Sequence, residues 1–201
     1  MSGSGGETAP ENTRERIIRA SMSVFKEHGY QGAALEEIAR RAGVSLDDLS
    51  SQFADKEELY HQACRDAVEG WHRWFVEKAS AEKDLLASFM TLCREAFLYL
   101  ARDDETREFL RAGPLVFIFS SDRFEDITER GVNFLASKLR ECAEAGIFRP
   151  MDYRRVAVTM HEVFKLLILT TYTKAYDERV EELFENVLEL FLHGLLAGPS
   201  S

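Results

Sequence analysis

Hydrophobic residues recur every three or four positions along almost the whole chain, and strict alternation of apolar and polar residues is hard to find. Such spacing places apolar side chains on one face of an α-helix, whereas alternation would indicate a strand. The pattern therefore predicts an all-α protein of about nine helices. The apolar run over residues 115–119 is ambiguous, because a buried strand could have the same composition. We interpret it as a helix start, since no partner strand is evident.

Short helices are predicted in the first part of the chain. The first begins after Asn12, where Glu15 forms a variant capping box, and is expected to end at Gly29. Two short helical patterns then flank Gly43, which suits the left-handed conformation that ends a helix. Ser45 follows as a good N-cap for the third helix. A helix, a glycine turn and a second helix form the arrangement that can lay one helix in a DNA major groove.

Longer helices are predicted for the rest of the chain. Apolar positions indicate a long fourth helix, a fifth over residues 85–100, a short sixth over 104–111 and another that stops at Gly146. The last two helices, around residues 156–171 and 180–195, carry apolar stripes wider than a monomer of this size needs. Packing both against a symmetry mate would form a four-helix bundle, which predicts a homodimer. Packing of both stripes within their own domain remains the alternative.

The domain organisation follows from these patterns. The sequence shows no internal repeat and no long linker, and a change in helix length places the natural boundary near Asp55. We predict a disordered arm over residues 1–12, a three-helix head over 13–55 and a helical body over 56–201. The arm is expected to be disordered because it is rich in glycine, serine and proline.

Composition limits the kinds of nucleic-acid contact that are open to the protein. The chain has 201 residues, of which 45% are hydrophobic and 30% charged, as is typical of a globular protein with a sizeable core. Its net charge is −10, so the molecule as a whole is not a basic surface for nucleic acid. Any DNA contact must therefore come from a few local groups.

Cysteine usage and the longest apolar runs bear on localisation. Three cysteines lie far apart without a paired motif, which favours buried thiols over a zinc or disulfide framework; a redox sensor is the alternative. The first residues lack the basic and apolar segments of a signal peptide. The longest apolar runs are too short to span a bilayer. The sequence therefore predicts a cytoplasmic protein without a membrane partner.

Several segments of the head resemble a known family. They are residues 25–30, residues 38–45, Phe53 and residues 56–59. Their spacing is similar to that of the TetR-type (tetracycline-repressor-like) helix-turn-helix regulators over roughly residues 14–60. The resemblance implies a homodimer whose N-terminal head binds a double-stranded DNA operator. It also implies that the helical body holds a pocket for a small effector and the dimer interface, and that effector binding releases the DNA.

The resemblance also implies a set of residues that face DNA. They lie at the start and end of the second helix, along the third and at the start of the fourth: Ala34, Arg40, Arg41, Ser45, Leu46, Asp47, Ser50, Ser51, Gln52 and Lys56. Four of these positions depart from the family pattern. The family usually has serine or threonine at position 34, a small residue at 47, tyrosine at 50, and histidine or tyrosine at 52.

The charge of the predicted head also departs from what DNA binding favours. Residues 11–60 carry seven lysines and arginines against ten acidic residues. Asp47 and Asp48 stand in the first turn of the third helix, where they can cap the helix and complement its dipole. The same carboxylates would repel phosphates, although an aspartate can accept from cytosine N4. We predict weaker or atypical operator binding; a head that does not bind DNA, in a protein acting through ligand or protein binding, is the alternative.

The body is rich in large aromatic rings, which the resemblance makes candidates for an effector pocket. The ligand-binding candidates are Trp71, Trp74, Phe75, Phe89, Cys93, Phe97, Phe117, Phe134, Met160, His161 and Phe164. An aromatic stripe at helical spacing also fits a plain core, and His161 also fits a partly buried structural histidine. Few charged residues accompany these rings, so we expect an apolar or aromatic effector.

Enzymatic functions find little support in the sequence. His161 and Glu162 lack the second histidine four residues on that a zinc-binding helix needs. No glycine-rich phosphate loop follows a strand. We therefore predict no catalytic residue, no metal and no cofactor.

Overall fold

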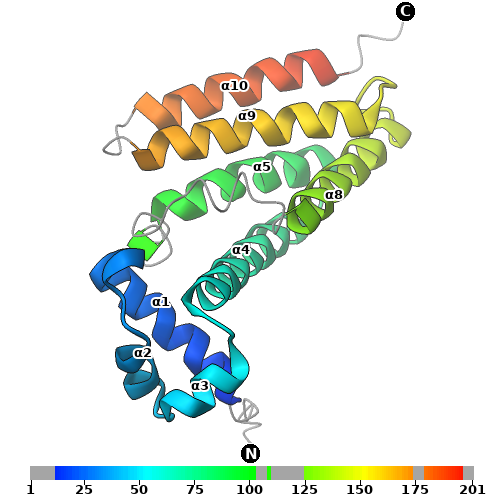
Figure 1. Cartoon of the computed structure of the whole chain (residues 1–201). Coiled ribbons are helices and arrows are strands. Elements are labelled where there is room, and N and C mark those ends of the chain that lie inside the picture. The colour runs from blue at the N-terminus through cyan, green and yellow to red at the C-terminus, as the bar shows by residue number, and fades with distance from the viewer. Residues whose placement is uncertain (1–11, 103–107, 110–124, 174–178, 197–201) are drawn as a thin grey trace, which may run out of the picture. The chain divides into compact units, whose positions relative to one another are not determined.

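The computed structural model describes residues 12–102, 108–109, 125–173 and 179–196. Its eight described helices are α1 (Thr13–Gly32), α2 (Leu35–Ala42), α3 (Leu46–Gln52), α4 (Lys56–Ser80), α5 (Leu85–Arg102), α8 (Glu125–Glu144), α9 (Tyr153–Thr173) and α10 (Arg179–Leu195) (Figure 1). The described residues form no strand, only an isolated bridge between Phe148 and Leu196. The predicted all-α fold is thus confirmed.

Three predictions fall on residues about which the structure says little. The arm over 1–12 and the run over 115–119 lie outside the described residues, apart from Asn12. Of the predicted helix over 104–111, only residues 108–109 are described, and both are helical. In the described part of the chain, no helix combines the length and apolar character needed to cross a membrane.

The described chain forms two compact units, and the division between them falls within α4. The first unit runs to Ala67 and includes Glu108 and Phe109, whereas the second begins at Val68. The predicted head, residues 13–55, lies wholly in the first unit.

The start of α1 follows its sequence pattern, and its regular geometry is interrupted at Gly29, the predicted end. Asn12 accepts a hydrogen bond from the Glu15 N–H at 2.9 Å, and the Glu15 carboxylate accepts one from the Asn12 N–H at 3.0 Å. Gly29 has a φ of 68°, which an L side chain adopts only with strain. The backbone is not helical at this residue, and one further turn follows the kink and ends at Gly32.

The head is held together by a small apolar core. The helical spacing of Phe25, Leu35, Ile38, Leu49, Phe53 and Leu59 predicts that they close this core, and all of them are buried except Leu35, which is half-buried. Full burial of each such side chain contributes roughly 1.5–3 kcal/mol, which stabilises a three-helix unit irrespective of what it binds.

The second unit is built on packed pairs of long helices. Arg154 of α9 pairs with Glu129 of α8 at 2.9 Å, and Arg94 of α5 pairs with Glu185 of α10 at 2.9 Å. The chain leaves α8 near Gly146, whose φ of 75° ends the helix as predicted. These ties connect α8 with α9 and α5 with α10.

Candidate nucleic-acid interface

The turn between α2 and α3 has the geometry of a helix-turn-helix. Gly43 adopts the left-handed conformation, with φ 67° and ψ 39°, and its N–H bonds to the carbonyls of Ala39 and Arg40. The Val44 N–H also reaches the Ala39 carbonyl, at 3.0 Å. Only glycine takes this conformation without a steric penalty, so the turn is fixed by one residue.

A complete capping box begins α3. The Ser45 hydroxyl accepts from the Asp48 N–H at 3.0 Å and donates to the Asp48 carboxylate at 2.6 Å. That carboxylate also accepts from the Ser45 N–H at 3.3 Å. The bonds from the Ser45 hydroxyl and backbone lower the pKa of Asp48 below its ordinary value. Ser45 and Asp48 are therefore engaged with each other and stabilise the start of the helix.

The outer face of α3, which we define as Leu46, Asp47, Ser50 and Gln52, is exposed to solvent. Leu46 is 40% exposed despite being apolar, whereas Leu49 faces the core. Among the described residues, the side chains of Asp47, Ser50 and Gln52 have no hydrogen-bond partner. Four of the predicted DNA-facing residues are thus accessible on α3. Leu46, Asp47 and Ser50 share one side of the helix, whereas Gln52 is about 200° round from Ser50.

Ser51 lies beside this face, but its hydroxyl donates to the Asp48 carbonyl at 2.7 Å. The hydroxyl can accept a further hydrogen bond, although its proton is already used. Ser51 could thus meet a donor on a base edge but could not donate to a phosphate.

The C-terminal end of α3 is fastened by Arg14, a residue that the sequence analysis did not single out. Its guanidinium donates to the Gln52 carbonyl at 2.9 Å and lies 4.3 Å from the centre of the Phe53 ring. A cation favours the carbonyl end of a helix dipole, and its contact with an aromatic face adds to this. The two residues are 38 positions apart, so no local spacing could have revealed the contact.

Arg40 and Arg41, two of the predicted DNA-facing residues, are paired with carboxylates of the head. Arg40 donates to Glu37 at 2.8 and 2.6 Å. Arg41 donates to Glu37 at 2.7 Å and makes two bonds to Glu27, both at 2.6 Å. Bonds from Arg41 lower the pKa of Glu27 to about 2, and bonds from Arg40 and Arg41 do the same for Glu37. Both carboxylates are therefore charged at neutral pH and neutralise the arginines.

Glu27 and Glu37 were not predicted to be partners of these arginines. Glu37 stands three and four residues before Arg40 and Arg41, which is the spacing of ion pairs on a helix surface. That signal was available. Glu27 lies on α1, and its pairing with Arg41 depends on how α1 and α2 pack.

Lys56 and Ala34, two further predicted DNA-facing residues, both have structural positions within the head. The Lys56 ammonium donates to the carbonyls of Gln31, at 3.2 Å, and Ala33, at 3.0 Å. It lies 5.0 Å from the centre of the Tyr30 ring. Lys56 therefore holds the start of α4 against the end of α1. Ala34 is the N-cap of α2 and, being alanine, makes no side-chain cap.

The predicted ligand-binding residues of the second unit fall into separate aromatic groups. The first joins α4 to α8: Phe75 lies 5.7 Å from Trp71, and His72 lies 4.9 Å from Phe75 and 5.1 Å from Phe134 between ring centroids. His72 was not predicted, although it stands three residues before Phe75 and shares its helix face. Burial lowers the pKa of His72, which favours the neutral ring.

The second group joins α5, α9 and α10. Phe97 and Phe184 stack at 4.3 Å between ring centroids, and Phe164 lies 5.5 Å from Phe184. Phe89 contacts Phe148 instead, at 5.1 Å. Cys93 and Met160 are buried as well. These contacts fit an aromatic core and equally the wall of a pocket.

The remaining candidates differ in their surroundings. His161 lies against Gly131 of α8, and burial lowers its pKa. Trp74 is exposed, donates to Glu95 at 3.2 Å and lies 5.6 Å from the Tyr99 ring between ring centroids. Phe117 lies outside the described residues. Among the described residues, no group of histidines, cysteines and carboxylates could hold a metal ion.

Part of the chain is similar in sequence to known bacterial regulators. Residues 17–63 match the family model described as bacterial regulatory proteins, tetR family. The chain is 25% identical over 206 residues to the HTH-type transcriptional regulator UidR of Escherichia coli (strain K12), covering 94% of this chain and 96% of UidR.

Solved structures share the fold. A TetR-family transcriptional regulator from Pectobacterium atrosepticum superposes with a TM-score of 0.78 at 18% identity, covering 94% of this chain and 96% of that one. The transcriptional regulator FadR from Bacillus subtilis, in complex with stearoyl-CoA, gives a TM-score of 0.70 at 20% identity, covering 89% and 97%. The likeness extends over both units and is not limited to the head.

Proposed function

We propose that this chain is a TetR-type helix-turn-helix transcriptional regulator, and that it is a homodimeric repressor released from its operator by a small apolar or aromatic effector. Its relatives and fold neighbours are transcriptional regulators and not enzymes. The observation that carries the proposal is the outer face of α3, which is exposed and free of internal partners on a well-capped helix.

Operator binding through this face would be weak. Most of the affinity of DNA-binding proteins comes from cations that neutralise phosphates. Arg40, Arg41 and Lys56 are engaged within the head, and Asp47 adds a negative charge to the outer face. Leu46, Ser50 and Gln52 would then supply most of the base contacts, with Asp47 facing a cytosine amino group.

A second function is favoured by the same contacts. Ser45 and Ser51 have already used their hydroxyl protons, and Ala34 offers no hydroxyl to a phosphate. A head with these features could have lost DNA binding. The protein would then act through its ligand or through another protein.

The proposed effector follows from the aromatic groups of the second unit. Phe97, Phe164 and Phe184 offer apolar surface, and His72 and His161 offer neutral rings that can form hydrogen bonds. FadR from Bacillus subtilis binds stearoyl-CoA, which contains a long apolar chain. An effector with an apolar body and few polar groups would suit this environment.

The proposed dimer interface uses the last two helices. Leu166 of α9 is 63% exposed, and Leu183 and Leu190 of α10 are 47% and 73% exposed. Leu183 and Leu190 are seven residues apart and share one helix face. Such an exposed apolar face is typical of an interface. Packing against the same helices of a second chain would cover it.

The direct test is DNA binding across a range of salt. Fluorescence anisotropy would measure the affinity of the full chain for DNA flanking its own gene, at low and moderate ionic strength. A repressor gives specific binding whose affinity falls with salt, with a shallow slope that reflects few phosphate contacts. Absence of binding even at low ionic strength would reject repression and support the second function.

A further inference from the structure

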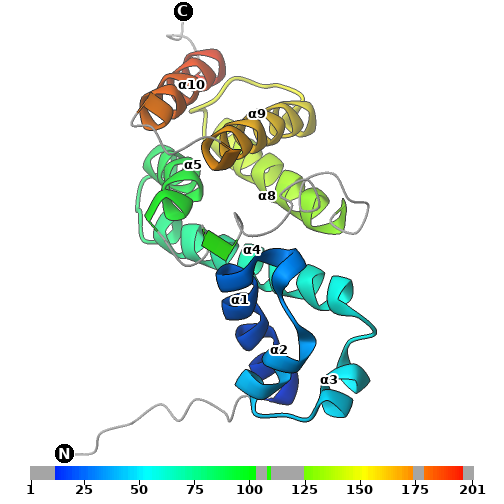
Figure 2. The same cartoon turned by 60° about the vertical axis from the view of Figure 1, so that its left-hand side comes forward.

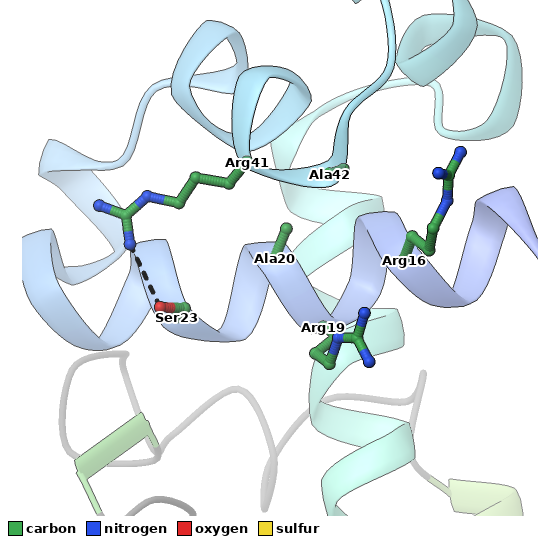
Figure 3. Close-up of a pocket in the computed structure, with 6 residues that line it drawn as sticks. All are labelled: Arg16, Arg19, Ala20, Ser23, Arg41 and Ala42. Carbon is green, nitrogen blue, oxygen red and sulfur yellow. Dashed lines mark hydrogen bonds between the residues drawn. The ribbon is translucent and has the colours of Figure 1, made fainter. Parts of the chain in front are cut away.

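A hollow of about 240 Å³ opens between α1 and the C-terminal end of α2, within the first unit (Figure 3). It is lined by Arg16, Arg19, Ala20, Ser23, Arg41 and Ala42. Ala20 and Ala42 carry only methyl groups, which leaves the space between the longer side chains. A single water needs only about 10–15 Å³ of such space, so the hollow has room for a polyatomic ion together with waters.

The Arg16 side chain in this hollow has a hydrogen-bond donor for which the head supplies no acceptor. Its Nε is buried and has no hydrogen-bond partner among the described residues. A guanidinium has five N–H donors and no acceptor, and a buried donor without a partner is unfavourable. An acceptor that enters the hollow from outside would satisfy it.

Arg41 lies across the hollow from Arg16 and is nearly saturated. It donates to Glu37, to Ser23 at 3.2 Å and twice to Glu27. Figure 3 shows Arg16 on the side of α1 that faces α2, with Ala20 and Ala42 between it and Arg41. Arg16 is therefore the principal donor, because the bonds of Arg41 to Glu27 and Glu37 leave it little to offer an anion.

We propose that this hollow binds a phosphate group, held mainly by Arg16. A guanidinium matches a phosphate because two of its N–H groups can donate in parallel to two oxygens. A tetrahedral phosphate also retains oxygens for waters in the rest of the hollow. The Arg41 guanidinium keeps its bonds to Glu27 and Glu37 and is not a donor to the phosphate.

The phosphate could come from two sources. Figures 1 and 2 place the first turns of α1 at the same end of the head as α3. A backbone phosphate of the duplex bound by α3 could therefore reach Arg16. Free phosphate is the other source. In the first case the inference rests on the DNA binding proposed above; in the second it does not.

The test compares three variants with the unaltered full chain. Arg16→Gln removes the donor, and Ala20→Leu fills the hollow without a change of charge. Lys26→Gln is the matched control, because it removes one exposed positive charge from the same helix outside the hollow. Circular dichroism checks that each variant folds. Arg16→Gln keeps the test decisive if Ala20→Leu disturbs the packing of α1 on α2.

The first measurement is thermal stability in sodium phosphate against sodium chloride of equal ionic strength. Phosphate should raise the melting temperature of the unaltered chain and of Lys26→Gln, but not that of Arg16→Gln or Ala20→Leu. The second is the salt dependence of binding to a DNA duplex. If the phosphate belongs to DNA, Arg16→Gln should lower the slope of log affinity against log salt by about one.

The outcomes separate the sources. A lowered DNA slope for Arg16→Gln assigns the hollow to the duplex backbone, and a lost phosphate effect with an unchanged slope assigns it to free phosphate. If the unaltered chain binds no DNA, but Arg16→Gln abolishes the rise in melting temperature caused by phosphate, the proposed repressor function is rejected and the proposed phosphate site is supported. If Arg16→Gln changes neither the phosphate effect nor the DNA slope, the inference is overturned.

Discussion

Single charged residues decide how much positive charge the head can offer to DNA. Glu27 holds Arg41 through two short bonds, and its own pKa is lowered to about 2 by that arginine. Because the carboxylate stays charged at neutral pH, the arginine is neutralised whenever the head is folded.

Replacing Glu27 with glutamine should therefore free the Arg41 guanidinium for a phosphate. We expect Glu27→Gln to bind DNA more tightly at low salt and to steepen the slope of log affinity against log salt by up to about one. Anisotropy titrations at several salt concentrations would measure both. Glu15→Gln removes the same charge from the same helix without a contact to Arg41 and is the control; equal slopes for the two variants would show that Arg41 does not meet DNA.

His161 should make the stability of the protein depend on pH. Burial lowers its pKa, and its Nδ1 lies 3.6 Å from the Glu162 carboxylate, too far for a hydrogen bond. The unfolded chain binds its proton near the ordinary histidine value of about 6.5, whereas the folded chain binds it only at lower pH. Below that value the unfolded state holds more protons, so the free energy of unfolding falls as pH falls.

Urea denaturation between about pH 7.5 and 5.5 would detect this, since one such histidine contributes at most about 1.4 kcal/mol per pH unit. His161→Gln should flatten the dependence. His28→Gln, at a half-exposed position, should not. An unchanged dependence in His161→Gln would show that the ring is protonated equally in both states.

At the scale of the element, α3 depends on its cap. The helix has only seven residues, and Leu49 is its one buried side chain. Ser45→Ala should lower the free energy of unfolding by about 1 kcal/mol, because the first-turn N–H groups lose their acceptor. Urea denaturation checks this. Ser50→Ala, on the exposed outer face, should change stability by less than about 0.5 kcal/mol.

The composition of the outer face of α3 should control DNA affinity without changing the fold. Asp47→Gly combined with Ser50→Tyr removes a negative charge and adds a hydroxyl that can reach the DNA backbone. We expect the double variant to bind any duplex more tightly than the unaltered chain, as measured by anisotropy at constant salt. Unchanged affinity would mean that these two side chains do not face the duplex.

Sequence patterns predicted the elements better than their partners. Capping residues and glycines act locally, so Asn12, Ser45 and Gly43 appeared in the sequence as they do in the structure. The contact of Arg14 with α3 and that of Glu27 with α2 depend on tertiary packing, which no local spacing encodes. The sequence therefore indicated which residues surround α3, but not which of them were already engaged.

At the scale of the whole molecule, the exposed leucines of α9 and α10 predict dimerisation. Leu190→Glu places a charge at the centre of the proposed interface, where its burial would be unfavourable. Light scattering after gel filtration should show the mass of two chains for the unaltered protein and of one chain for Leu190→Glu. Leu85→Glu, at an exposed position at the start of α5, should keep the unaltered mass. A single-chain mass for the unaltered protein would reject the interface.

The fastening of α3 has a consequence for how the head can change over time. Arg14 holds the backbone carbonyl of Gln52 and not its side chain, and the cap at Ser45 is likewise local. Side chains on the outer face take no part in either attachment. Substitutions at those four positions can thus change the DNA sequence that α3 binds, or abolish its DNA binding, while the fold of the head is unchanged. The exposed residues of α3 can therefore be exchanged without loss of the contacts that hold the helix. The acidic residue on its outer face in this chain is compatible with the same fold of the head.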